Sequence, residues 1–123
     1  MKRLLVLMAA LGVAACGGGG YGGSPTTGPQ NPTLAADVAA TPSLAFTPGT
    51  VTLVQGGTVT FKFGSVDHNV YFDNAPAGAP ANITGANSNV TKALTFTTTG
   101  TYVYNCHLHP GMRGTVIVVA PTP

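Results

Sequence analysis

Tryptophan and glutamate are absent from the sequence, and charged residues make up only 7% of its 123 residues. Five lysines and arginines stand against three aspartates, which gives a formal net charge of +2. So little charge cannot build a basic nucleic-acid surface or an acidic tail, and nucleic-acid binding is excluded. The two cysteines permit at most one disulfide, and their positions argue against even that bond. The length allows one small domain with appendages.

Glycine and proline are frequent instead, at 17 and 10 residues, together with many valines and threonines. This composition favours short strands and turns over helices. Apolar residues recur with a period of two, and no segment has a convincing period of 3.6. The recurring residues are Val51, Leu53, Val59, Phe61, Phe63, Val70, Phe72, Val90, Leu94 and Phe96. The pattern predicts an all-β domain over residues 43–120, a small antiparallel Greek-key sandwich or barrel of six to eight strands.

The N-terminus has the pattern of an export signal. Lys2 and Arg3 precede an apolar run over residues 4–15, which is shorter than the roughly 20 residues that span a bilayer. Its end, Val13-Ala14-Ala15-Cys16, resembles the lipobox of bacterial lipoproteins. We therefore expect a signal peptide over residues 1–15 and a lipid on Cys16, which would anchor the protein to a membrane in the periplasm or at the cell surface. The alternative is an ordinary signal that leaves Cys16 free.

A Gly- and Pro-rich stretch over residues 16–42 follows this cysteine. It has little periodic apolar character, which is the composition of a flexible tether. The expected arrangement is therefore a signal peptide, a lipid-anchored tether and one β-domain.

The residues that carry chemistry lie near the C-terminus. Cys106, His109 and Met112 follow one another at intervals of three, and Pro110-Gly111 lets the loop turn tightly. One thiolate, one imidazole and one thioether can therefore converge. His68 can supply a fourth group, because strand parity places it on the side of the core-facing Val70. Two imidazoles, a thiolate and a weak axial thioether are the ligand set of a blue copper electron-transfer site.

The chain resembles the cupredoxin family, and within it the plastocyanin/amicyanin group. The resemblance covers residues 43–119. It is carried by His68-Asn69-Val70, by Gly100-Thr101-Tyr102 leading into Cys106, by the Cys-x-x-His-x-x-Met loop and by the closing strand over residues 113–119.

The resemblance implies one type 1 copper bound by His68, Cys106, His109 and Met112. It also implies that Asn69 ties the two ligand-bearing segments together. The expected function is the shuttling of single electrons between redox partner proteins that dock near His109, by a monomer that converts no substrate itself.

Other interpretations remain open at this point. The protein could store or deliver copper, or His68 could be a hydrogen-bonded core histidine in a purely structural sandwich. A structural zinc site would leave Met112 unexplained. His107 follows Cys106 directly, so strand alternation turns it away from the sulfur. We interpret it as an exposed imidazole or as one that supports the ligands.

Overall fold

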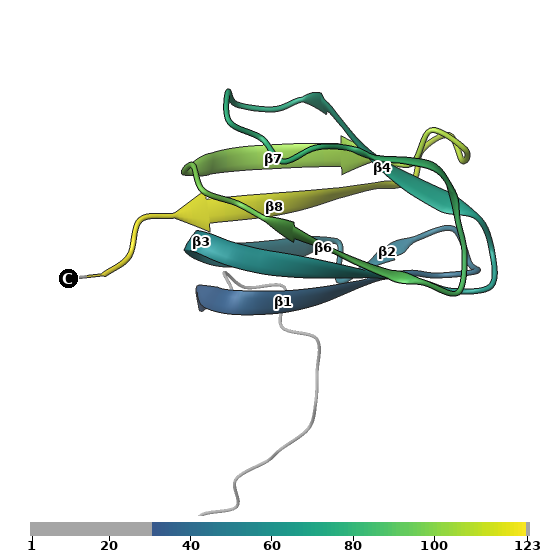
Figure 1. Cartoon of the computed structure of the whole chain (residues 1–123), viewed down its shortest axis with the longest axis horizontal. Coiled ribbons are helices and arrows are strands. Elements are labelled where there is room, and N and C mark those ends of the chain that lie inside the picture. The colour runs from purple at the N-terminus through teal and green to yellow at the C-terminus, as the bar shows by residue number, and fades with distance from the viewer. Residues whose placement is uncertain (1–30, 123) are drawn as a thin grey trace, which may run out of the picture.

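The computed structural model describes residues 31–122, which form eight β-strands and no helix (Figure 1). The strands are β1 (Thr33–Ala40), β2 (Phe46–Thr47), β3 (Thr50–Phe63), β4 (His68–Asn74), β5 (Ile83–Asn87), β6 (Thr91–Thr95), β7 (Gly100–Asn105) and β8 (Arg113–Val119). The all-β prediction is therefore confirmed. Within residues 31–122 there is no helix of the length and hydropathy that crossing a membrane requires.

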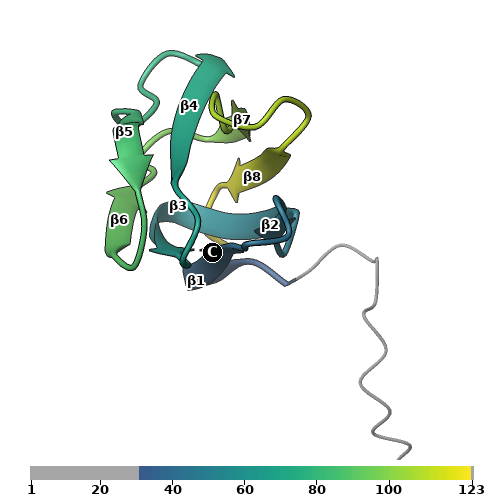
Figure 2. The same ribbon diagram turned by 90° about the vertical axis from the view of Figure 1, so that its right-hand side faces the viewer.

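The strands form one curled sheet in the order β2-β1-β3-β8-β7-β4-β5, with β6 also paired to β3. Seen along the strands, β4 and β7 lie opposite β1 and β3, while β5 and β6 lie along one side (Figure 2). The first part of β3 pairs with β8, and its second part pairs with β1 and β6. Gly56, with a φ of +88°, lies where β3 changes partners. One long strand thus pairs with three others, β1, β6 and β8.

Two of the strand pairs differ from the antiparallel prediction. β1 pairs with β3, and β3 with β8, in parallel, whereas the remaining pairs are antiparallel. The sheet is therefore mixed, because in both parallel pairs other strands separate the two partners in the sequence, β2 in the first pair and β4–β7 in the second.

The domain also begins earlier than the predicted boundary at residue 43. Residues Thr33–Ala40, which the sequence pattern places in the tether, form β1. Only Val38 and Ala40 of this strand are buried, and alanine is its main apolar residue. Such small side chains give a weak period-two signal, which explains the error. The predicted signal peptide, Cys16 and the first part of the tether lie outside the described residues.

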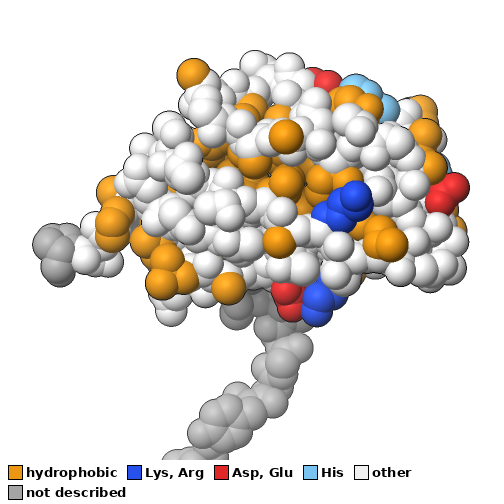
Figure 3. Space-filling model, viewed as in Figure 1, with side chains coloured by type: hydrophobic (Ala, Val, Ile, Leu, Met, Phe, Trp, Pro, Cys, Tyr) orange, Lys and Arg blue, Asp and Glu red, His pale blue; other side chains and the backbone are white. Residues whose placement is uncertain are grey.

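The core fills the space between the two sides of the curled sheet. Most of the predicted inward positions are buried, with Leu53, Val59, Phe61 and Val70 fully so. Val90 is an exception, with 43% of its surface exposed, because it precedes β6 at the edge of the sheet. Figure 3 shows that the few charged side chains are scattered over the visible face rather than gathered in one patch.

Two tyrosines of β7 complete this core. Tyr102 donates a hydrogen bond from its hydroxyl to the Thr98 carbonyl four residues back. Tyr104 packs edge-on against Phe46 and Phe61, and its hydroxyl is the one buried side-chain polar atom without a partner among residues 31–122. This burial raises the pKa of Tyr104 well above its ordinary value.

Gly114 of β8 makes room for the Tyr104 ring. A Cβ at position 114 would overlap the ring and its hydroxyl, so Gly114→Ala is expected to lower the free energy of unfolding by about 1–3 kcal/mol through overpacking. Tyr104→Phe should be neutral or stabilising, because it removes a hydroxyl that lacks a partner. Urea unfolding of both variants and of the double variant measures these effects. A Gly114→Ala protein as stable as the parent would contradict this packing.

Candidate metal centre

Three strand ends and one loop meet at one end of the molecule. His68 is the first residue of β4, Cys106 follows the last residue of β7, and residues 106–112 connect β7 to β8. In Figure 1 these segments lie together at the right-hand end. The fold therefore brings residues far apart in sequence to one place.

The loop after Cys106 is closed by its own backbone. The Cys106 N–H donates to the Met112 carbonyl over 2.9 Å, and the Met112 N–H donates to the His109 carbonyl over 3.1 Å. Gly111 has a φ of +86°, a conformation that glycine adopts without strain. These bonds hold Cys106, His109 and Met112 around one short turn.

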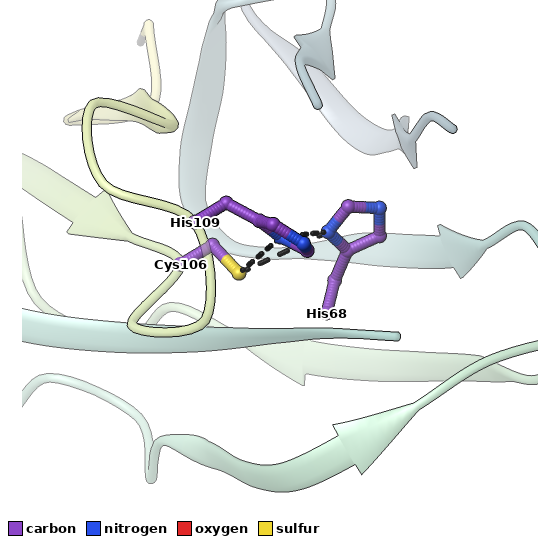
Figure 4. Close-up of side chains that lie close together, drawn as sticks. All are labelled: His68, Cys106 and His109. Carbon is purple, nitrogen blue, oxygen red and sulfur yellow. Dashed lines mark hydrogen bonds between the residues drawn. The ribbon is translucent and has the colours of Figure 1, made fainter. Parts of the chain in front are cut away.

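The nitrogen and sulfur atoms of three side chains converge, as Figure 4 shows. The Nδ1 atoms of His68 and His109 are 3.1 Å apart, and the Cys106 Sγ lies 3.8 Å and 3.5 Å from them. A point about 2 Å from all three atoms exists, which is close to the length of a bond from a first-row metal to imidazole or thiolate. The donor set therefore fits a trigonal metal ion. It is the one such group of His, Cys or acidic side chains in the described part of the chain.

Burial separates most of this group from solvent. His68, Cys106 and Met112 are 0%, 3% and 4% exposed, whereas His109 is half-buried. Met112, whose thioether is a weak metal ligand, belongs to the same buried cluster as Cys106. The structure thus places all four sequence-predicted ligand residues at this end, with the edge of His109 nearest to solvent.

The tautomer of His68 is set by a backbone carbonyl. Its Nε2–H donates to the Thr41 carbonyl over 2.9 Å, which leaves a lone pair on Nδ1, the atom that faces Cys106 and His109. Burial lowers the pKa of His68, and the nearby His109 lowers it further. The hydrogen bond to the Thr41 carbonyl and the charge of Asp67 raise the pKa, but the net shift is downward. A neutral imidazole with its lone pair directed at the site is the form that binds a metal.

Asn69 makes three hydrogen bonds, two of which join the two ligand-bearing segments. Its backbone N–H points at the Cys106 Sγ over 3.5 Å, and its Oδ1 accepts the His107 N–H over 2.7 Å. Its Nδ2 donates to the Gly85 carbonyl over 3.1 Å. A donor to sulfur stabilises a thiolate. The Oδ1 bond fixes β4 relative to the loop, and the Nδ2 bond fixes it relative to β5.

His107 lies outside this group. Its ring stacks on Tyr71, with centroids 3.9 Å apart, and its Nε2 lies 2.8 Å from an oxygen of Asp73. Asn105 also donates to Asp73, over 3.2 Å. The alternation of β7 predicts only the side to which the His107 ring points, so it does not identify Tyr71 or Asp73 as partners of the ring.

The chain is similar to solved copper proteins. Amicyanin from Paracoccus versutus matches at 31% identity with a TM-score of 0.56, over 73% of this chain and 86% of that chain. An amicyanin variant in its reduced Cu(I) form at pH 4 matches at 29% identity with a TM-score of 0.58, over 73% of this chain and 87% of the other.

A copper-containing nitrite reductase from Thermus scotoductus SA-01 matches with a TM-score of 0.63, over 75% of this chain. This chain spans only 24% of the reductase chain, and at 24% identity the likeness shows the fold alone. No curated protein matches with comparable significance.

The family model of copper binding proteins of the plastocyanin/azurin family matches residues 33–119. The match runs from the first residue of β1 to the last residue of β8 and includes every residue of the metal centre. It confirms the expected cupredoxin resemblance and copper as the cofactor, for which the His, Cys and Met donors have the arrangement typical of a type 1 site. By this match over its whole β-domain, the chain belongs to the plastocyanin/azurin family of copper binding proteins.

Proposed function

We propose that this protein carries single electrons between redox partners through one type 1 copper, held by His68, Cys106, His109 and Met112. The observation that carries the proposal is the buried convergence of the Cys106 Sγ with the Nδ1 atoms of His68 and His109. Copper, when bound, supplies the Cu(II)/Cu(I) couple. Soft sulfur suits Cu(I) and imidazole suits both states, so one fixed donor set can serve the whole cycle.

The protein's contribution is to keep these donors in place. Thr41 holds the His68 ring, Asn69 holds the segment that carries Cys106, and the closed loop holds His109 and Met112. Donors that do not move when the charge changes add little to the barrier for electron transfer, which is the advantage of a preorganised site. The buried setting also excludes water.

Electrons would leave and enter through the edge of His109. This ring is half-buried, and the residues beside it, Leu108, Pro110 and Gly111, are exposed. The described residues contain three basic and three acidic side chains. The charged side chains on the face that Figure 3 shows are scattered rather than gathered in one patch. Docking of a redox partner here would therefore rest on apolar contact with little electrostatic steering, as suits a short-lived complex. We propose that the protein acts as a monomer.

Two features favour electron transfer over catalysis or copper delivery. The chain spans most of the length of amicyanin but a quarter of the nitrite reductase chain, so a carrier of similar size is the nearer comparison. A protein that delivers copper needs exchangeable ligands, whereas His68 and Cys106 are buried. These observations support a carrier that converts no substrate.

One experiment separates electron transfer from copper delivery. Mixed Cu(II)- and Cu(I)-loaded protein should show rapid electron self-exchange by NMR line broadening, while a competing copper chelator withdraws the metal slowly. Rapid loss of copper to the chelator, together with slow electron exchange, would instead support storage or delivery.

We further propose that residues 1–15 are a signal peptide and that Cys16 carries a lipid, which places the copper domain in the periplasm or at the cell surface. Cys16→Ala is expected to release the protein from membranes without changing its copper spectrum, because the intervening tether separates the anchor from the site. Membrane fractionation and a visible spectrum measure the two effects. A variant that stays in the membrane fraction would exclude anchoring through Cys16.

A further inference from the structure

The pairing of β5 with β4 is interrupted beside the metal centre. His68 is opposite Asn87 and Val70 is opposite Ile83, with a register shift between the two pairs. Three residues of β4 therefore face five residues of β5. Gly85 lies in the interruption with a φ of +80°, which a side chain rarely tolerates. Irregular pairing of this kind often re-aims a side chain next to a functional site.

The Asn87 side chain bridges this interruption. It is 8% exposed, and its Nδ2 donates to the His68 carbonyl over 3.0 Å and to the Thr84 carbonyl over 3.1 Å. The amide thus supplies donors that a regular strand would have provided from its backbone. In return, Asn69 Nδ2 donates to the Gly85 carbonyl. Two side-chain amides therefore cross the same gap in opposite directions.

We propose that Asn87 is a positioning residue for the copper ligand His68. Asn87 holds the His68 carbonyl at the backbone, while Thr41 holds the ring at Nε2. A ligand fixed at both ends keeps its Nδ1 in place when the charge of the metal changes. This inference rests on the proposed role of His68 as a copper ligand. Neither alternation nor the Cys-x-x-His-x-x-Met loop points to Asn87.

Asn87→Ala tests this role, with Asn82→Ala as the matched control. Asn82 Oδ1 accepts the N–H of Phe72, so the control also removes a side-chain bond to β4, but four residues beyond His68. Asn87→Ala should remain blue, with a changed Cu(II) hyperfine splitting in electron paramagnetic resonance and about tenfold slower electron self-exchange, equivalent to a barrier higher by about 1.4 kcal/mol. In the metal-free protein, its His68 ring signals should broaden in NMR. Asn82→Ala should match the parent in all three measurements.

Gly85→Ala provides a second test that leaves the Asn87 side chain intact. Its control is Gly56→Ala, because both glycines have positive φ and neither has an atom near an added Cβ. Gly85→Ala should change the hyperfine splitting, the self-exchange rate and the His68 ring signals. Gly85→Asn should change these three measurements less, because asparagine tolerates positive φ. Gly56→Ala should change only the stability of the protein.

The outcomes separate the two proposals. If the parent protein lacks a blue site, the proposed function fails. If the parent is blue but Asn87→Ala and Gly85→Ala change only stability, as their controls do, the positioning role is excluded while the proposed function stands. If Asn87→Ala does not fold, Gly85→Ala decides by the same measurements.

Discussion

Cys106→Ser is expected to abolish the intense visible absorption of the copper-loaded protein completely. That absorption arises from charge transfer between a thiolate and Cu(II), and a serine hydroxyl is neither as easily ionised nor as polarisable. The fold should survive, because the Asn69 N–H that points at Sγ can donate to the new hydroxyl. Burying that hydroxyl should cost about 1 kcal/mol. Visible spectra and circular dichroism measure the two effects.

Cys16→Ser is the matched control for this variant, because it removes the other cysteine of the chain. It should keep the full blue absorption. A blue band that persists in Cys106→Ser, or one that disappears in Cys16→Ser, would show that Cys106 is not the thiolate ligand.

Met112→Leu is expected to keep the blue site and raise its reduction potential. A thioether donates weakly to copper and stabilises Cu(II) more than Cu(I), so an apolar side chain in its place favours the reduced form. We expect an increase of roughly 60 mV or more, which is a tenfold change in a one-electron equilibrium constant. Leucine preserves the volume of this buried position, so the fold should change little. Cyclic voltammetry measures the potential.

His107→Ala is the control from the same loop. Its ring contacts Tyr71 and the exposed Asp73 but none of the proposed ligands. An exposed pair of this kind contributes little to stability, so the colour and potential should stay near those of the parent. If His107→Ala lost the blue site while His109→Ala kept it, the second imidazole ligand would be His107 and the predicted loop register would be wrong.

The core of the fold was predictable because it depends on a local pattern. Alternation identified Leu53, Val59, Phe61 and Val70 as inward residues, and they are fully buried. The pattern failed where burial depends on the edges of the sheet. Val90 alternates correctly yet is exposed, because it precedes an edge strand. The sequence pattern does not reveal β1, because its alanines carry almost no pattern. The parallel pairings join strands that are not consecutive in the sequence, which no local signal records.

The metal centre was predictable as far as its side chains are concerned. Cys106, His109 and Met112 are close in sequence, and their types already limit the metal. The supporting contacts could not be predicted in the same way. The Thr41 carbonyl is a backbone group that any residue would supply, and it comes from 27 positions before His68. Asn87 reaches His68 only because β5 pairs irregularly with β4. Such contacts follow from the folded backbone.

Titration of the metal-free, purified protein with Cu(II) is the most direct test of the blue copper site. We expect an intense blue or green thiolate-to-copper band that grows linearly and saturates at one copper per chain, with the narrow hyperfine splitting of a type 1 site in electron paramagnetic resonance. Binding without this band, or saturation at a different ratio, would contradict the assignment of His68, Cys106, His109 and Met112 as the ligands of one blue copper.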